Sequence, residues 1–265
     1  MARFRLATWN VNSLKARLEK VEEWLAYAEP DVLCLQETKV ADAAFPVMAF
    51  SALGYEVASH GEGRWNGVAI ASRVGMGDVV AGFSHAPEDP GVESRLLSAT
   101  CGGVRVSTVY VPNGRAVGTE HYEAKLAWLG DLRRHLLESC DPGGRVVVCG
   151  DFNVAPDDRD VWDPRRAHGG THVSEPERAA LRELLDWGLE DAFRLQHEGG
   201  QLFSWWDYRA GDFHKHKGMR IDLVLASRPL AERVTFALVD RQARKGKAPS
   251  DHAPLLVDFE LEPAP

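Results

Sequence analysis

Polar side chains follow several apolar segments of the chain, at the points where strands of a sheet would end. Asn10 and Asn12 follow the first of these segments, and Glu37 follows the second. Asp151 and Asn153 follow another segment near the middle of the chain. Residues two apart in an extended chain point to the same face, so each pair can direct two polar groups toward one site. Side chains gathered at strand ends are typical of active sites in α/β proteins.

Acidic and imidazole groups recur late in the chain, at Asp222 and at the adjacent Asp251 and His252. The groups that could hold a metal ion supply oxygen and one imidazole, from Asn10, Glu37, Asp151, Asn153, Asp251 and His252. Such hard ligands suit Mg²⁺ or Mn²⁺ far better than a structural zinc. Each segment alone is typical of a turn or a solvated strand end. Their joint occurrence beside apolar strands is what favours a metal-dependent active site.

Short apolar, β-branched runs that predict strands alternate with helical patterns along the whole chain. The predicted strands are 3–9, 32–36, 68–72, 79–83, 96–101, 104–111, 146–149, 221–226, 234–239 and 255–261. One helix is expected to start after Ser13 and to stop at Pro30, and a second to start after Thr119. Ser174 and Glu177 have the spacing of a capping box and predict the start of a third helix.

This alternation predicts an α/β fold of two packed mixed sheets with helices outside. Helices between the early strands favour parallel pairing there, and the closely spaced strands within 68–111 favour hairpins or a meander. No Gly/Ser-rich or Pro-rich linker divides the chain, so residues 1–265 are expected to form a single domain. The pattern does not fix the order of the strands.

The composition, 45% hydrophobic and 26% charged over 265 residues, is that of a chain with a sizeable core. It excludes a disordered, collagen-like or coiled-coil protein. No apolar run is long enough to span a membrane, and the first ten residues lack the features of a signal peptide. A cytoplasmic protein is therefore expected. Four cysteines without a Cys-x-x-Cys pair predict reduced, structural thiols, with Cys34 and Cys149 inside strands.

The formal net charge of −8 taken alone argues against a nucleic-acid-binding protein. Two local windows, Arg209–Arg220 and Arg241–Ser250, are basic, however, and each leads directly into a candidate site segment. Their cations include Lys215, Lys217 and Arg220 before Asp222, and Arg244, Lys245 and Lys247 before Asp251. The simplest interpretation is two solvated loops. Their positions favour contacts with phosphate groups near the site, for which Arg115 and Lys125 are weaker candidates.

The segments, in their order along the chain, resemble the exonuclease III family of endonucleases that act at abasic sites. The resemblance covers nearly the whole chain and rests on Thr8–Leu14, Leu35–Lys39, Trp65–Ala69, Tyr110–Gly114, Gly150–Asn153, Ser204–Tyr208, Arg220–Asp222 and Ser250–His252. It implies the DNase I-like fold, a four-layer sandwich with the site at one edge. It also implies an Mg²⁺-dependent phosphodiesterase that cuts DNA 5′ to abasic sites and acts on 3′ ends.

The resemblance implies a role for each matching residue. Glu37 would be the principal metal carboxylate, with Asn10 and Asp251 as companions. Asp151 would orient and activate the attacking water, and Asn153 would contact the phosphate in the transition state. His252 would contact the phosphate or act as an acid–base group, oriented by Asp222. Tyr110 would place its phenol near the scissile phosphate, and Asn113 would support the phosphate pocket.

Several alternatives stay open at this point. One ion or two could act, because Asp151, Asn153 and His252 could hold a second ion or work without one. Asp222 could instead pair with Arg220, two residues away. Trp205 and Trp206 could be a core pair, but alternation sends them to opposite faces, so at least one is expected to line the substrate pocket.

The expected partner is double-stranded DNA with abasic sites or 3′ ends, bound by a monomer associated with the nucleoid rather than with a membrane. Two other functions compete with this one. The same fold and metal could act on a lipid or inositol phosphate, or the chain could be a catalytically dead DNA-binding module. The Trp pair argues against the first, and the complete set of acidic and imidazole residues argues against the second.

Overall fold

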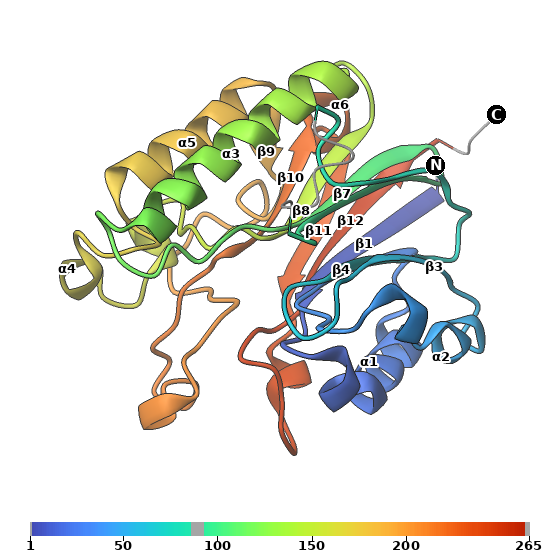
Figure 1. Ribbon diagram of the computed structural model, residues 1–265, viewed down its shortest axis with the longest axis horizontal. Coiled ribbons are helices and arrows are strands. Elements are labelled where there is room, and N and C mark those ends of the chain that lie inside the picture. Colours follow the sequence, from blue (N-terminus) through green and yellow to red (C-terminus); the bar gives the residue numbers. More distant parts are fainter. Residues whose placement is uncertain (1, 86–92, 263–265) are drawn as a thin grey trace.

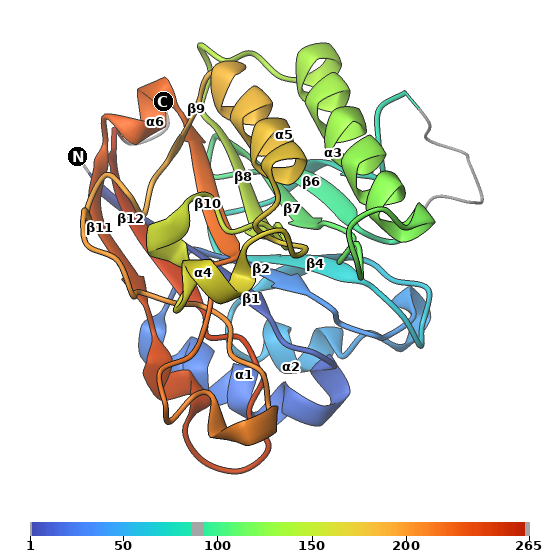
Figure 2. The same ribbon diagram turned by 90° about the vertical axis from the view of Figure 1, so that its left-hand side faces the viewer.

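Two six-stranded sheets pack face to face, and each is covered by helices on its outer side (Figures 1 and 2). The computed structural model describes residues 2–85 and 93–262. Figure 2 shows the four layers, with α3 (Glu120–Ser139) and α5 (Glu175–Asp186) over one sheet and α1 (Leu14–Ala28) and α2 (Val47–Ser51) over the other. The predicted four-layer α/β sandwich is confirmed.

The first sheet has the strand order β11-β12-β1-β2-β4-β3. Its strands are β1 (Ala2–Asn10), β2 (Val32–Gln36), β3 (Glu56–His60), β4 (Val68–Ser72), β11 (Val234–Val239) and β12 (Leu255–Leu261). β1 and β2 run parallel, as predicted, and their other neighbours run antiparallel. The crossover between them is α1 (Leu14–Ala28), which buries Val21, Trp24 and Leu25.

The second sheet has the order β5-β6-β7-β8-β10-β9. Its strands are β5 (Gly77–Ala81), β6 (Leu96–Cys101), β7 (Val104–Tyr110), β8 (Val146–Asp151), β9 (Leu189–Asp191) and β10 (Asp222–Ser227). β7 and β8 run parallel around the long helix α3 (Glu120–Ser139), beside which α5 (Glu175–Asp186) packs. The remaining helical segments are short: η1 (Asp42–Ala44), α2 (Val47–Ser51), η2 (Asp158–Asp160), α4 (Pro164–Ala167), η3 (Arg209–Gly211), α6 (Arg228–Ala231) and η4 (Arg241–Arg244).

The meander expected within 68–111 forms only in part. β5, β6 and β7 pair consecutively and antiparallel, but β4 belongs to the other sheet. Both edges of β4 are already hydrogen-bonded, to β2 and to β3, so no edge remains for β5. The chain therefore changes sheets between Ser72 and Gly77.

The cysteines behave as predicted. All four lie within the described ranges and carry free thiols, and Cys34, Cys101 and Cys149 are buried in the core between the sheets. Burial raises the pKa of the Cys34 thiol well above its ordinary value. Such thiols stay protonated and act as small apolar side chains.

The helix starts differ in how they are capped. Ser174 and Glu177 form the predicted capping box, and the Thr119 side chain accepts a hydrogen bond from the Tyr122 N–H. Ser13 precedes α1 as predicted but makes no side-chain cap, because its φ of 89° departs from the extended conformation that capping needs.

Thr119→Ala is expected to lower the free energy of unfolding by about 1 kcal/mol, because it leaves the Tyr122 N–H without its cap. Urea unfolding followed by tryptophan fluorescence measures the loss. Thr119→Ser keeps the hydroxyl and serves as the control. A variant with alanine that is as stable as the serine variant would show that the cap contributes nothing.

A buried histidine makes part of the stability dependent on pH. His135 on α3 accepts a hydrogen bond from the Ser84 N–H at 3.0 Å, and burial lowers its pKa to about 4. In the unfolded chain the imidazole takes up a proton below about pH 6.5, which the folded protein resists. His135 therefore does not reduce the free energy of unfolding above about pH 6.5. Below that pH it lowers the free energy of unfolding progressively as the pH falls toward 4.

Between about pH 7 and pH 4.5 the wild type is expected to lose about 2 kcal/mol more stability than His135→Gln does. The comparison isolates the imidazole, since all other groups titrate in both proteins. Urea unfolding at the two pH values measures it. Equal losses in both proteins would mean that His135 takes up its proton as readily in the folded protein as in the unfolded chain.

Candidate active site

The candidate site lies where both sheets end, at one edge of the sandwich. In the second sheet, Tyr110, Asp151 and Asp222 are paired neighbours at the ends of β7, β8 and β10. In the first sheet, Asn10 ends β1 and Glu37 follows β2 directly. A hydrogen bond joins the two sheets here, with the Asn10 Nδ2 lying 3.0 Å from the Asp151 Oδ2.

Glu37 and Asp151 face one another across a single amide group. The Asn10 Nδ2 donates to the Glu37 Oε1 at 2.8 Å as well as to Asp151. The Asn10 Oδ1 accepts from the Asn12 N–H at 3.0 Å, so Asn10 holds the two carboxylates together through its nitrogen. Lys39, which the motif analysis did not single out, lies 2.8 Å from the Glu37 Oε2.

His252 forms a dyad with Asp222. Its Nδ1 lies 2.8 Å from the Asp222 Oδ2, and its Nε2 lies 3.7 Å from the Asp151 Oδ2. All three side chains are almost fully buried. Burial lowers the pKa of His252, but the carboxylates of Asp222 and Asp151 outweigh this and raise it to about 10. The imidazole is therefore a cation at neutral pH, with its Nδ1 proton held by Asp222.

The alternative pairing of Asp222 with Arg220 is wrong. The Arg220 guanidinium lies 2.6 Å from Asp160 and 2.7 Å from Asp191, and its side chain is completely buried. Arg220 is therefore also not available to bind DNA, contrary to the prediction from the basic window. Its charge is used inside the protein to join η2 to β9.

Two other groups at this edge have raised pKa values. Burial raises the pKa of Asp151 to about 7; the positive charge of His252 opposes this shift, while Asp222 and Glu37 add to it. Burial also raises the pKa of the Tyr110 phenol, as do the charges of Glu37 and Asp151. The Arg95 guanidinium stacks on the Tyr110 ring at 4.6 Å. Asp151 can therefore exchange a proton near neutral pH, whereas Tyr110 remains a proton donor.

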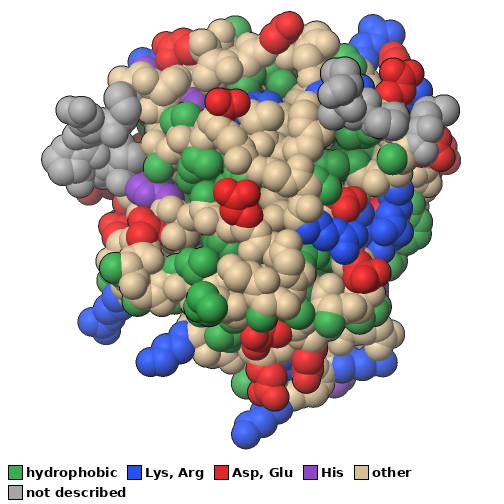
Figure 3. Space-filling model, turned by 90° about the vertical axis from the view of Figure 1, so that its right-hand side faces the viewer, with side chains coloured by type: hydrophobic (Ala, Val, Ile, Leu, Met, Phe, Trp, Pro, Cys, Tyr) green, Lys and Arg blue, Asp and Glu red, His purple; other side chains and the backbone are tan. Residues whose placement is uncertain are grey.

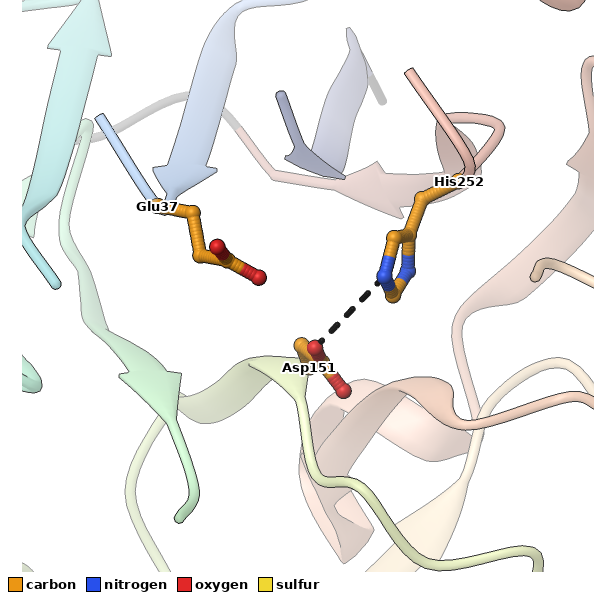
Figure 4. A group of neighbouring side chains, drawn as sticks. All are labelled: Glu37, Asp151 and His252. Carbon is orange, nitrogen blue, oxygen red and sulfur yellow. Dashed lines mark ion pairs between the residues drawn. The ribbon is translucent and has the colours of Figure 1, made fainter. Parts of the chain in front are cut away.

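Glu37, Asp151 and His252 bring potential metal-ligand atoms together, and His252 can be a ligand only when its Nε2 is deprotonated. One ligand atom from each lies within 4.8 Å of the others, and the three side chains point toward a common centre (Figure 4). The donors are two carboxylates and an imidazole, a set that fits a hard divalent cation. Asp251 lies outside this group, and its two oxygens accept from the Asn12 Nδ2 and the Trp205 Nε1.

The two predicted asparagines are tied to each other. The Asn113 Nδ2 lies 3.2 Å from the Asn153 Oδ1, and the Asn153 Nδ2 donates to the Val111 carbonyl at 2.9 Å. The Asn153 N–H donates to the Asp151 Oδ1 at 2.9 Å. Both amides therefore lie on the loops that follow β7 and β8, next to the Asp151 carboxylate.

The tryptophan pair divides as alternation predicts, but only one member can meet a ligand. Trp206 is fully buried in a cluster with Phe203 and Ala253, so its predicted contact with DNA is wrong. Trp205 is partly exposed, and its Nε1 donates to the Asp251 Oδ2 at 3.2 Å. Its backbone pairs with His252, which places the indole beside the site.

The two basic windows form loops that project together from the site edge, below the sheets in Figure 1. The Tyr208 hydroxyl donates to the Pro249 carbonyl at 2.9 Å and joins them. Arg244 is buried against the rings of Trp206 and Phe213, so its predicted contact with DNA is wrong. Of the cations predicted to contact DNA, Lys215, Lys217, Lys245 and Lys247 remain accessible, and Lys217 partly covers the Trp162 ring.

A cleft of about 680 Å³ opens beside Tyr110 and Asn113. Trp65, which is 64% exposed, lines it together with Arg95 and Arg115. Motif reasoning placed Trp65 within a matching segment but gave it no role. The right-hand side of the molecule in Figure 1 carries acidic, basic and hydrophobic side chains interspersed (Figure 3). None of the helices in residues 2–85 and 93–262 is long and apolar enough to cross a membrane.

Comparisons with known proteins identify the family of this chain. The pattern of the Endonuclease/Exonuclease/phosphatase family matches residues 7–252. The chain is 34% identical over 268 residues to the exodeoxyribonuclease III of Haemophilus influenzae, an alignment covering 97% of this chain and 100% of the relative.

Solved structures are similar over the same extent. A 3′ phosphatase from Neisseria, bound to a product DNA hairpin, superposes with a TM-score of 0.93 at 38% identity. An AP endonuclease from Archaeoglobus fulgidus gives the same TM-score and identity. Each alignment covers 97% of this chain and 100% of the solved one.

Proposed function

The chain belongs to the endonuclease/exonuclease/phosphatase family, and from this premise we propose that it is a DNA-repair phosphodiesterase of the exodeoxyribonuclease III type. It cleaves duplex DNA 5′ to abasic sites and acts 3′→5′ on duplex ends and blocked 3′ termini. The observation that carries the proposal is the meeting of Glu37, Asp151 and the His252–Asp222 dyad at one edge. The relatives named for abasic-site, exonuclease and 3′ phosphatase activities support it.

Asp151 orients the attacking water and accepts its proton, as a carboxylate beside the reacting phosphate can do. The water oxygen forms the new bond to phosphorus, and the bond to the 3′-oxygen breaks. The His252 imidazolium, held by Asp222, faces the negative charge that develops on the phosphate. Tyr110 and Asn153 stand beside Asp151 and donate hydrogen bonds to the phosphate or the leaving group.

The proposed metal is Mg²⁺, or Mn²⁺ in its place. Glu37 and Asp151 would hold it, and its charge neutralises a non-bridging phosphate oxygen when it is bound. Asn10 keeps the two carboxylates together, while Asp251 and Asn12 flank them. We therefore propose that the two carboxylates hold the ion and that His252 contacts the phosphate.

The partner proposed is double-stranded DNA that carries an abasic site or a 3′ end. Trp205 offers a stacking surface next to Asp251, and Asn113 supports the phosphate pocket. Lys215, Lys217, Lys245 and Lys247 contact phosphates on either side of the cut. We further propose that residues 1–265 act as one domain and as a monomer, in the cytoplasm with the nucleoid DNA.

The competing functions have less support. A dead DNA-binding module would have lost part of the acidic and imidazole set, whereas Glu37, Asp151, Asp222 and His252 are all present and in contact range. An enzyme acting on a lipid or inositol phosphate would not need the accessible indole and the lysines of the two loops.

One labelled duplex, prepared in three forms, tests the proposal. The forms carry an internal abasic-site analogue, a recessed 3′ end or a 3′-phosphate, and each is incubated with Mg²⁺ or with EDTA. Incision at the abasic site together with shortening from 3′ ends is expected with Mg²⁺ alone. Incision at the abasic site only would narrow the proposed activity to that of an abasic-site endonuclease. Action on 3′ ends only would narrow it to processing of 3′ termini. No metal-dependent cleavage of any form overturns the proposal and directs the assay to lipid phosphates.

A further inference from the structure

A buried ion pair lies behind the site, where the mechanism does not use it. Lys125 of α3 and Glu177 of α5 form a salt bridge, and both side chains are completely buried. Lys125 was a weak candidate for DNA contact, but its burial excludes that role. Burial raises the pKa of Glu177, yet the pairing with Lys125 and the bonds from Ser174 and His172 outweigh it and hold that pKa below its usual range.

The ammonium group of Lys125 is shared between the carboxylate and two main-chain carbonyls. Its Nζ lies 2.7 Å from the Asn153 carbonyl oxygen and 3.4 Å from that of Asn113. A lysine has three N–H donors, so these three acceptors account for all of them. The two carbonyls belong to the loops that follow β7 and β8, both of which carry site residues.

Glu177 extends this network to the segment before α5. Its oxygens accept from the His172 N–H at 3.0 Å and from the Ser174 N–H at 3.1 Å. The Thr171 hydroxyl lies within 3.1 Å of both Glu177 and the Asn113 carbonyl. The pair thus fixes three loops relative to one another from inside the protein.

Asn153 is the point at which the network reaches the catalytic carboxylate. Its φ of 51° lies in the left-handed region, which asparagine enters more readily than other residues with a side chain. Lys125 and the His172 Nδ1 bind its carbonyl, while its N–H donates to the Asp151 Oδ1. The turn that Lys125 holds therefore also directs Asp151.

The Lys125 side chain packs tightly against the loop that follows β7. A Cβ added at Gly114 would lie 2.9 Å from the Lys125 Cδ and 3.2 Å from the Thr171 Oγ1. A buried ion pair is not needed for stability, because apolar side chains of similar volume often serve as well. A geometric role accounts for the charged pair and for its contacts to site loops.

We propose that Lys125 and Glu177 are a positioning pair that fixes the main chain at Asn113 and Asn153 and thereby orients the Asp151 carboxylate. Neither residue touches the substrate. The activity arm of the test rests on the proposed function, whereas the exchange arm does not.

The first variant is Lys125→Met/Glu177→Gln, which removes both charges but keeps an oxygen for the His172 and Ser174 N–H groups. We expect a folded protein, a kcat lowered about 10-fold to 100-fold with KM unchanged, and faster amide hydrogen exchange in residues 150–156 without metal or DNA. The control is Arg5→Met/Asp258→Asn, which removes a partly buried ion pair from the middle of β1. It is expected to lower stability and to leave kcat unchanged.

A second pair of variants keeps both charges of the ion pair and changes only the packing around the Lys125 side chain. Gly114→Ala and Gly118→Ala carry similar backbone strain, with φ of 81° and 79°, but a Cβ at Gly118 meets nothing within 4 Å. Gly114→Ala is expected to lower kcat and to speed exchange at 150–156, and Gly118→Ala to do neither. This comparison decides the matter if the double variant fails to fold.

Wild-type kcat and wild-type exchange in a folded Lys125→Met/Glu177→Gln protein would overturn the inference, as would equal behaviour of Gly114→Ala and Gly118→Ala. A wild-type protein that cleaves none of the DNA forms would refute the proposed function instead. The exchange measurements would still decide whether the pair fixes the Asn153 turn.

Discussion

Asp151→Asn is expected to lower kcat for abasic-site incision by about 10³-fold, because the amide cannot take the proton of the attacking water. The asparagine keeps the size of the side chain and an oxygen for the Asn153 N–H, which now donates to the Asp151 Oδ1 at 2.9 Å. The hydrogen bond from the Asn10 Nδ2 to the Asp151 Oδ2 is lost, but the fold is expected to survive. Single-turnover cleavage with saturating Mg²⁺, together with a thermal melt, measures both quantities.

Asp141→Asn is the matched control, since Asp141 lies on the segment that enters β8 at its other end and caps Gly143 there. That variant should cleave as the wild type does. If a folded Asp151→Asn protein cleaved at the rate of the control, the water-activating group would have to be another residue, and Asp151 would be reduced to a structural role.

The chemistry of the site could be predicted because its residues stand at the ends of strands, which the sequence shows as short apolar runs. Glu37, Asp151 and His252 each follow or precede an apolar run, and the sheets need only bring those ends to one edge. The strands at 32–36, 68–72, 96–101, 234–239 and 255–261 were likewise predicted with the bounds they have. β3 and β9 were missed because neither contains an apolar run: β3 is Glu-Val-Ala-Ser-His and β9 has three residues.

The predicted DNA contacts were less successful because charge along the sequence does not reveal partners far away in it. Arg220 belongs to a basic window, yet its partner Asp160 is 60 residues earlier. Lys125 sits on a helix among polar residues, yet its partner Glu177 is 52 residues later. Only the packing of the helices and sheets decides whether such cations face water or each other.

The tryptophan pair shows the same limit at short range. Alternation correctly puts Trp205 and Trp206 on opposite faces, but nothing in the segment says which face is the core. That depends on Phe213 and Arg244, which come from the two loops and cover the Trp206 ring. The basic window that suggested DNA binding thus supplies part of the core beneath the site.

Asp222→Asn is expected to lower kcat about as strongly as removal of the orienting carboxylate does in other carboxylate–histidine dyads, by about 10³-fold or more. The Asp222 Oδ2 holds the His252 Nδ1 at 2.8 Å and raises the pKa of the imidazole, which reaches about 10. Without that charge the pKa of His252 falls, because burial still lowers it and fewer carboxylates oppose the shift. A larger share of the imidazole is then neutral at the working pH, and the ring can hold its proton on the wrong nitrogen.

An NMR titration of His252 in the metal-free protein separates this effect from a loss of fold. In the wild type the imidazolium should persist above neutral pH, and in Asp222→Asn it should deprotonate at a lower pH, in parallel with the loss of kcat. Asp186→Asn, an exposed change at the last residue of α5, should alter neither quantity. An unchanged His252 titration in a slow Asp222→Asn enzyme would show that Asp222 orients the ring without setting its charge. An unchanged kcat would remove the dyad from the mechanism, and the phosphate charge would then have to be met by the metal and Tyr110 alone.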